Sequence, residues 1–103
     1  MSNKLSQEAK GRQCQIAILG VCNGNPETTV LAHLNNKRLF RCGMGMKVPD
    51  WAGAWACSDC HDCVDFRTKH PSLTNAEIKL AHMEGVVRTM RILIEEGKII
   101  SNS

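Results

Sequence analysis

One short segment brings together more reactive side chains than any other part of the chain: Cys57-Ser58-Asp59-Cys60-His61-Asp62-Cys63-Val64-Asp65. Cys57 and Cys60 have the two-residue spacing of a metal-binding knuckle. His61 follows directly, and Asp65 lies four residues after it, so the two would share one face of a helix. The segment therefore predicts a sulfur site for a soft metal beside a nitrogen and oxygen site for a hard one.

The length of the chain predicts a single domain over residues 1–103. Aromatic residues make up only 4% of the sequence, which indicates a thin hydrophobic core. A domain this small buries a modest share of its surface, so a structural metal would add much to its stability. The apparent binding free energy of structural zinc is about 10–16 kcal/mol, and much of it is folding energy.

The chain carries six cysteines and a formal net charge of +3. It begins with a polar stretch rather than a signal peptide, and it lacks an apolar run long enough to span a membrane. We therefore expect a cytoplasmic protein without a membrane partner. Cysteines in a reducing compartment favour metal binding over disulfides. The mild positive charge is compatible with nucleic acid but does not by itself indicate it.

The local pattern predicts an α+β fold. Residues 1–11 are expected to form a polar N-terminal arm or a short frayed helix. The segments 14–18 and 28–34 are predicted to pair as a β-hairpin, because the first alternates weakly, the second has β-branched residues, and turn-forming residues lie between them. A short helix is predicted over 60–68, ending before Pro71. Hairpin, knuckle and helix would form a core over residues 12–70.

A long amphipathic helix is predicted over residues 75–96, within a C-terminal segment 74–97. Thr74 and Glu77 have the spacing of a capping box, and Gly97 is a natural stop. Apolar residues recur at helical spacing between these ends. The helix should bury Val86, Met90 and Leu93 against the hairpin or against another copy, so a homodimer through it is one arrangement that the sequence allows. His82 is expected to pack at mid-helix.

Cys14 and Cys22 are the expected second half of the sulfur site, giving four thiolates around a structural Zn²⁺. Two alternatives remain open at this point. Cys14 and Cys22 could be buried apolar residues, since free cysteine buries readily. His61 could also replace one thiolate as a zinc ligand. The remaining cysteines, Cys42 and Cys63, are expected to be unliganded, although Cys63 is close enough in sequence to exchange with Cys60.

A strand that ends in His33, followed by a C-x-x-C-H knuckle leading into a helix, resembles the HNH nucleases, also called ββα-metal or His-Me finger nucleases. Within that superfamily the chain most resembles a small phage and prophage family, described by name as nucleases, that includes YbcO. The resemblance covers roughly residues 12–68. It is carried by Cys14, Cys22-Asn23-Gly24-Asn25-Pro26-Glu27-Thr28, Val30-Leu31-Ala32-His33, Gly43-Met44-Gly45-Met46-Lys47, Pro49-Asp50 and Ala56-Cys57-Ser58-Asp59-Cys60-His61-Asp62.

The resemblance implies a metal-dependent endonuclease that hydrolyses DNA phosphodiester bonds in the cytoplasm of a bacterial host. His33 would be the general base, a role that suits imidazole because it titrates near neutral pH. His61 would hold a divalent cation, with Asp65 as a second ligand and Asp50 as a further candidate. Carboxylate ligands favour Mg²⁺ or Mn²⁺. An ion pair between Asp65 and Lys69 is the alternative role for that carboxylate.

The sequence also departs from the superfamily pattern. Ala32 stands where many HNH nucleases have a metal-binding residue, and the middle Asn lacks a clear match. Asp50 could take part of its role, and Asn35 or Asn36 could orient His33. These departures favour a second hypothesis, a non-catalytic zinc-stabilised DNA-binding or adaptor module. A redox switch using Cys60 and Cys63 has little support, since the chain lacks a thioredoxin-type unit.

Basic side chains near the expected site are candidate phosphate contacts. Two glycines among them would let backbone approach a phosphate. The chain has few aromatic residues for stacking on bases, so weak sequence preference is expected. The candidate phosphate-binding residues are Lys37, Arg38, Arg41, Lys47 and Arg67.

Overall fold

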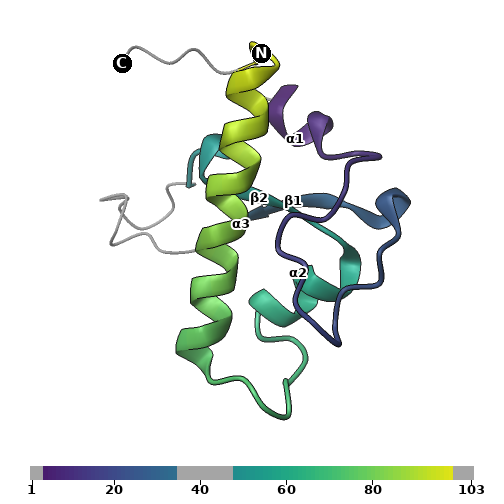
Figure 1. The fold of residues 1–103 in the computed structure, drawn as a ribbon, viewed down its shortest axis with the longest axis vertical. Coiled ribbons are helices and arrows are strands. Elements are labelled where there is room, and N and C mark those ends of the chain that lie inside the picture. Colours follow the sequence, from purple (N-terminus) through teal and green to yellow (C-terminus); the bar gives the residue numbers. More distant parts are fainter. Residues whose placement is uncertain (1–3, 35–47, 99–103) are drawn as a thin grey trace.

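The computed structural model describes residues 4–34 and 48–98. Its elements are helices α1 (Lys4–Glu8), α2 (Ser58–Val64) and α3 (Asn75–Glu95), strands β1 (Val30–His33) and β2 (Gly53–Ala56), and the short 3-10 turns η1 (Pro26–Thr28) and η2 (Asp50–Ala52). The predicted α+β class is confirmed. Figure 1 shows α3 running the length of the molecule, with the strands and α2 beside it. In the described ranges, none of the helices has the length and apolar character needed to cross a bilayer.

The predicted hairpin is wrong in its pairing. β1 pairs antiparallel with β2, so that Val30 faces Ala56 and His33 faces Gly53. Residues 14–18 form a loop that reaches the sheet through one hydrogen bond, from Gln15 N to Trp55 O at 2.6 Å. All four residues of β2 are buried. A strand buried on both faces has none of the alternation that marks a half-exposed strand, so the sequence pattern does not reveal β2.

Helix α2 begins and ends earlier than predicted. It begins at Ser58 because Cys57 caps it: the Cys57 Sγ accepts a hydrogen bond from the Cys60 N–H at 3.4 Å. It ends at Val64 rather than before Pro71. Phe66 follows in the left-handed region, with φ of 60°. Hydrogen bonds from Phe66 N to Cys63 O and from Arg67 N to Asp62 O then close a Schellman motif.

Helix α3 confirms the predicted C-terminal helix almost to the residue. Thr74 and Glu77 make both hydrogen bonds of the capping box. The helix ends at Glu95, one residue before the predicted end, and Gly97 has a φ of +76°. A hydrogen bond from Lys98 N to Leu93 O completes a second Schellman motif. Both ends were readable from sequence because each depends on a few adjacent residues.

The inner face of α3 packs closely on β2 and on the loop through Ile16. At Gly85 an added Cβ would lie 2.7 Å from Ile16 Cγ1 and 3.2 Å from Ala54 Cβ, so the approach requires glycine. Val86 and Leu93 are buried as predicted, and Met90 is half-buried. The sheet side of the molecule, rather than another copy, therefore receives this face of the helix.

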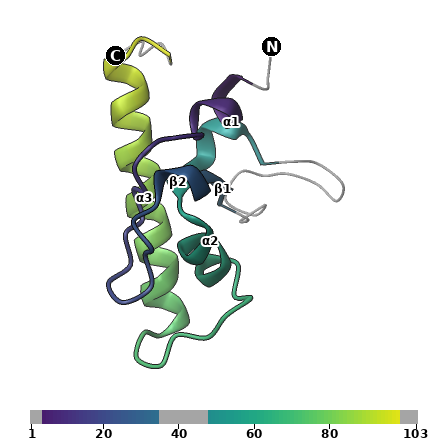
Figure 2. The same ribbon diagram turned by 90° about the vertical axis from the view of Figure 1, so that its right-hand side faces the viewer.

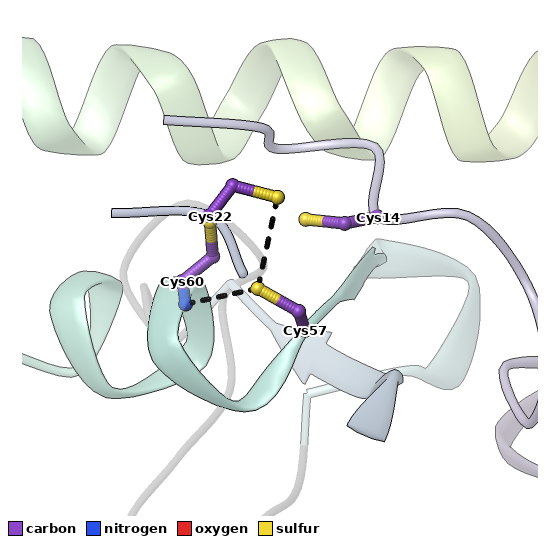
Figure 3. A group of neighbouring side chains, drawn as sticks. All are labelled: Cys14, Cys22, Cys57 and Cys60. Atoms are coloured by element: carbon purple, nitrogen blue, oxygen red, sulfur yellow. Dashed lines mark hydrogen bonds between the residues drawn. The ribbon is translucent and has the colours of Figure 1, made fainter. Parts of the chain in front are cut away.

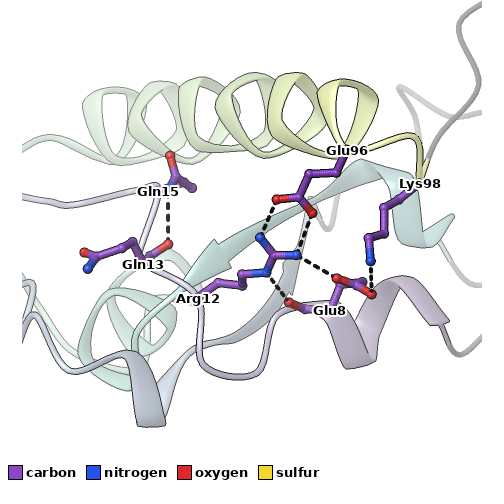
Figure 4. A network of polar contacts seen from close by, with 6 residues as sticks. All are labelled: Glu8, Arg12, Gln13, Gln15, Glu96 and Lys98. Carbon is purple, nitrogen blue, oxygen red and sulfur yellow. Dashed lines mark hydrogen bonds and ion pairs between the residues drawn. The ribbon is translucent and has the colours of Figure 1, made fainter.

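The N-terminal segment contains the short helix expected as the alternative to an arm, α1, and it docks on the domain. Ala9 is buried with Trp55 and Leu93 in a second small core cluster. Arg12 lies over the Trp55 ring, 4.6 Å from its centroid. The Arg12 guanidinium also binds Glu96 at 2.6 Å and Glu8 at 2.8 Å, which joins α1 to the end of α3 (Figure 4). These contacts explain why the described chain ends lie near one another.

The Thr89 hydroxyl makes a buried polar contact between α3 and β2. It accepts a hydrogen bond from the backbone N–H of Trp55 at 3.0 Å and donates one to the Gly85 carbonyl oxygen at 2.8 Å. Thr89 is fully buried. Thr89→Val keeps the shape but leaves the Trp55 N–H without its partner. The variant is expected to lose about 1–3 kcal/mol of stability. Thr89→Ser keeps the hydroxyl and is the control; a valine variant that matches wild type in chemical denaturation would contradict this role.

Candidate functional site

Four cysteines converge from two distant parts of the chain. The Sγ atoms of Cys14, Cys22, Cys57 and Cys60 all lie within 4.8 Å of one another. Figure 3 shows Cys14 and Cys22 on the N-terminal loop, facing Cys57 at the start of α2 and Cys60 within it. The predicted grouping of these four residues is confirmed. Cys14 and Cys22 are thus members of a thiol cluster and not separate buried apolar side chains.

The backbone around the cluster is arranged to stabilise thiolates. The Cys14 Sγ accepts a hydrogen bond from the Ala17 N–H at 3.3 Å, and the Cys57 Sγ accepts one from the Cys60 N–H at 3.4 Å. Both bonds join a sulfur to the amide three residues later, so the two cysteines have the same local geometry. Ala17 reaches its position with a φ of 49°. Such N–H donors favour the ionised form of sulfur.

The thiols cannot all ionise side by side without a cation. The hydrogen bond from Cys60 lowers the pKa of Cys14, while the neighbouring Cys14 sulfur and then burial raise the pKa of Cys60. Burial also raises the pKa of Cys22. One proton leaves easily and the others are held more tightly, as expected for crowded groups of like charge. A divalent cation at the centre would remove this conflict.

The donor set and spacing fit zinc. Tetrahedral zinc with Zn–S bonds of about 2.3 Å requires sulfur atoms about 3.8 Å apart. The Sγ atoms of Cys22 and Cys57 are separated by 3.8 Å. A bound Zn²⁺ here would tie the N-terminal loop to α2 and supply folding energy, and four thiolates would leave no open coordination position.

The alternative ligands stand outside this cluster in the described part of the chain. His61 Nε2 lies instead 3.2 Å from Asp65 Oδ2. Cys63 is buried, and burial raises the pKa of its thiol. Cys42 falls in residues 35–47, outside the described ranges. The expectation that Cys63 is not part of the sulfur site therefore agrees with the structure.

His33 is paired with Asp50. The distance from His33 Nε2 to Asp50 Oδ1 is 2.9 Å, and both side chains are about one-third exposed. β1 carries His33 at its last position, and η2, which leads into β2, carries Asp50. With Nε2–H donating to the carboxylate, Nδ1 keeps its lone pair. The pair therefore presents an oriented imidazole that can accept a proton, and Asp50 occupies the orienting position considered for Asn35 or Asn36.

His61 and Asp65 form a second pair one helical turn apart, as their spacing predicted. Their separation is 3.2 Å, and Arg67 Nη2 lies 3.7 Å from the same Asp65 oxygen. Asp65 thus pairs with His61 and Arg67 in preference to the predicted alternative, Lys69. One imidazole nitrogen and one carboxylate can supply two ligands to a hard cation, and the remaining ligands would come from water or substrate.

His82 makes a buried contact beside His33, and this contact was not predicted. It is 6% exposed, and its Nε2 donates a hydrogen bond to the carbonyl oxygen of Ala32 at 2.8 Å. Ala32 is the residue directly before His33 in β1. Burial lowers the pKa of His82, and the charges of Asp65, His61 and His33 all act on it. These three side chains are therefore near enough to His82 for their charges to influence its pKa. A buried histidine on an apolar helix face was the available sequence signal, but packing alone explained it equally well.

His82 is expected to make stability depend on pH. Its pKa is lowered in the folded state, so the unfolded chain binds more protons; stability is complete above the unfolded pKa of about 6.5 and falls as the pH drops below it. His82→Gln can keep the hydrogen bond to Ala32 O while removing the titration. Urea unfolding measured above and below this pH should show that the free energy of unfolding falls less in the variant than in the wild type. Equal losses in both proteins would contradict the assignment.

The predicted phosphate contacts are mostly outside the described residues. Lys37, Arg38, Arg41 and Lys47 all fall within 35–47. Arg67 is described: its side chain is 65% exposed and lies 3.6 Å from Asp62 and 3.7 Å from Asp65. It is near the candidate cation ligands and accessible from solvent, and its contact with phosphate stays a prediction.

The fold and the cysteine cluster define a small α+β protein with a candidate metal centre. A family model described as "Putative nuclease YbcO" matches residues 3–98, so the chain belongs to the YbcO family. It is 48% identical over 95 residues to "Putative nuclease YbcO" of Escherichia coli K12 and to a protein of the same description from Enterobacteria phage 82. Each match covers 92% of this chain and 95% of the relative.

A solved structure resembles the fold as well. It is described as that of a putative bacteriophage protein from Escherichia coli strain K-12, substrain MG1655. The TM-score is 0.74 at 43% sequence identity, and the match covers 89% of this chain and 98% of the other. The relatives therefore span nearly the whole of this domain.

Proposed function

We propose that this protein is a metal-dependent endonuclease of the HNH type that hydrolyses DNA phosphodiester bonds. The observation that carries the proposal is the presence of two histidine–carboxylate pairs, His33–Asp50 and His61–Asp65, in a member of the YbcO family. A structural module would need neither pair. The relatives' description as nucleases supports the same function.

In the proposed reaction, His33 accepts a proton from water at Nδ1 as the water oxygen forms a bond to phosphorus. Asp50 holds the imidazole through Nε2 and stabilises the positive charge that develops on it. The phosphorus–oxygen bond to the leaving sugar breaks, and that oxygen takes a proton from solvent. His82 holds the Ala32 carbonyl, and so fixes the end of β1 that carries His33.

His61 and Asp65 are the residues that would hold the catalytic cation. When bound, Mg²⁺ or Mn²⁺ would polarise the phosphate and stabilise charge on the leaving oxygen. Arg67 beside them could neutralise a neighbouring phosphate. Zinc in the four-cysteine site would have a structural role only. We place the protein in the cytoplasm of the bacterial host, where its DNA substrate is found.

The test is cleavage of supercoiled plasmid by purified protein with added Mg²⁺ or Mn²⁺. Nicking should require the added cation and stop when EDTA replaces it, with the zinc content measured in both arms. Asp65→Asn weakens a cation ligand and should raise the cation concentration needed for half-maximal rate. Cleavage that persists in EDTA with zinc retained, or an unchanged cation requirement in the variant, would contradict the assigned site.

A non-catalytic DNA-binding or adaptor role is the second candidate. It is favoured by Ala32, which stands where many HNH nucleases supply a metal ligand. A folded, zinc-loaded protein that retards DNA in a gel but leaves plasmid intact with either cation would support this role. Branched and single-stranded DNA belong in the same assay, because the preferred substrate structure follows from neither the fold nor the site.

A further inference from the structure

Helix α3 has a second apolar face besides the one that packs on the sheet. Four exposed residues lie along it, Leu80, Met83, Val87 and Ile94, and Met90 lies at its border with the inner face. We call this row the outer seam. Leu80 is 57% exposed, Val87 61%, Met83 46% and Ile94 42%, while Met90 is half-buried. With 3.6 residues per turn, the seam lies well away from the buried row that contains Ile78, His82, Gly85, Val86, Thr89 and Leu93.

This spacing is that of a helix that packs against another helix. Alternating steps of three and four residues place apolar side chains on a narrow stripe, as in the a and d positions of a coiled coil. Single exposed apolar residues are common on soluble proteins, but a continuous row along a helix marks an interaction surface. Figure 2 shows α3 along one side of the molecule, with α1, the strands and α2 on its other side.

The charges beside the outer seam identify the occupant. Glu84 flanks its N-terminal half and Arg91 its C-terminal half, seven residues apart on the same side. Both are highly exposed, with side-chain exposures of 55% and 80%. Their partners within the helix are Arg88 at 3.8 Å and Glu95 at 3.2 Å. Such exposed pairs are weak, so neither side chain is firmly held.

We propose that the outer seam binds the outer seam of a second copy of this chain in antiparallel orientation. A two-fold axis near Val87 places Leu80 opposite the partner's Ile94 and Glu84 opposite the partner's Arg91. By the same symmetry Arg91 faces the partner's Glu84, so two favourable contacts form. Parallel pairing would instead separate Glu84 from the partner's Arg91 by about two helical turns. The two Glu84–Arg91 contacts therefore form only when the helices run in opposite directions.

The helix is long enough for such an interface. Its 21 residues span about 32 Å at 1.5 Å per residue, and the seam from Leu80 to Ile94 covers about 21 Å of that length. Because α3 is held to its own sheet by the opposite face, it needs no rearrangement to receive a partner. The proposal concerns a surface separate from both histidine pairs, and it is independent of the nuclease assignment.

The first experiment measures the mass in solution over a range of protein concentrations by light scattering coupled to size exclusion. The wild type should reach twice the 11.4 kDa chain mass. Val87→Glu should remain at one chain mass with unchanged zinc content and thermal unfolding, because glutamate favours helix at least as well as valine. Leu19→Glu makes the same kind of change at a residue that is 94% exposed and lies outside α3, and should stay dimeric.

The second experiment tests orientation by exchanging charges. Glu84→Arg gives each chain two basic residues beside the seam, and Arg91→Glu gives each chain two acidic ones. Each variant alone should form dimers more weakly than wild type, by at least tenfold in the dissociation constant. An equimolar mixture of the two should recover wild-type affinity as a heterodimer, because every contact again joins opposite charges.

Three results would overturn the antiparallel dimer. A wild type that is monomeric at all concentrations removes the second copy as occupant and assigns the seam to a different partner. A dimer that survives Val87→Glu places the interface elsewhere on the molecule. A mixture that remains as weak as its components rules out the antiparallel orientation. Mass is measured directly, so each of these results holds whether or not the protein cleaves plasmid.

Discussion

A Cys57→Ala variant is expected to lose its metal and its cooperative folding, whereas Cys63→Ala keeps both. The two positions form a matched pair. Cys57 is 0% exposed and Cys63 is 1% exposed, and they lie at the cap and in the last turn of the same short helix. Replacing either removes one buried sulfur. Only Cys57 belongs to the four-thiol cluster.

The difference between these variants should be large. The apparent binding energy of structural zinc is about 10–16 kcal/mol, while a domain of this kind has a total stability of about 5–15 kcal/mol. Losing the ion removes an amount comparable to the whole stability. Cys57 also caps α2, because its Sγ accepts a hydrogen bond from the Cys60 N–H. Cys57→Ala therefore removes this cap as well as the zinc ligand. Cys63→Ala should cost only about 1–2 kcal/mol from the lost apolar contact.

Zinc content per chain and thermal unfolding by circular dichroism check this prediction. Wild type and Cys63→Ala should each hold one equivalent of zinc and unfold in one transition. Chelator added to wild type should reproduce the behaviour of Cys57→Ala. If the two alanine variants lost zinc and stability equally, the cysteine cluster would not be the metal site.

The features that sequence predicted well depend on short stretches of chain. The capping box at Thr74 and the stop at Gly97 each involve neighbouring residues, so the bounds of α3 could be read directly. The four cysteines could be grouped because Cys57 and Cys60 have the spacing of a metal knuckle and Cys14 and Cys22 could complete a four-thiolate site. His61 and Asp65 came together because four residues make one helical turn.

The features that sequence missed depend on contacts between distant segments. β2 consists of four buried residues, Gly53–Ala56, without polar and apolar alternation, and its pairing with β1 became visible only in three dimensions. The same strand pairing brings His33 and Asp50 together, because η2 lies directly before β2 and so places Asp50 at the end of β1. His82 reaches Ala32 O across fifty residues of sequence. No local pattern encodes any of these three contacts.

His33→Ala is expected to reduce the rate of plasmid cleavage by about 10²–10⁴-fold, the usual contribution of a general base. The fold should tolerate the change. His33 is the last residue of β1, its side chain is about one-third exposed, and its partner Asp50 is exposed enough to be solvated after the change. Zinc content and thermal unfolding should therefore match wild type, which separates a chemical loss from a structural one.

Imidazole added to the buffer gives a sharper measurement than the rate loss alone. The space left by His33→Ala is open to solvent, and Asp50 remains to orient a free imidazole through its ring N–H. Part of the lost cleavage should return as imidazole concentration rises, and the rescue should be weaker in His33→Ala/Asp50→Asn, which lacks the orienting charge. A side chain that only supported the fold would show no such rescue. Undiminished cleavage by His33→Ala would mean that another group removes the proton from water, and the His33–Asp50 pair would then be left with a positioning role at most.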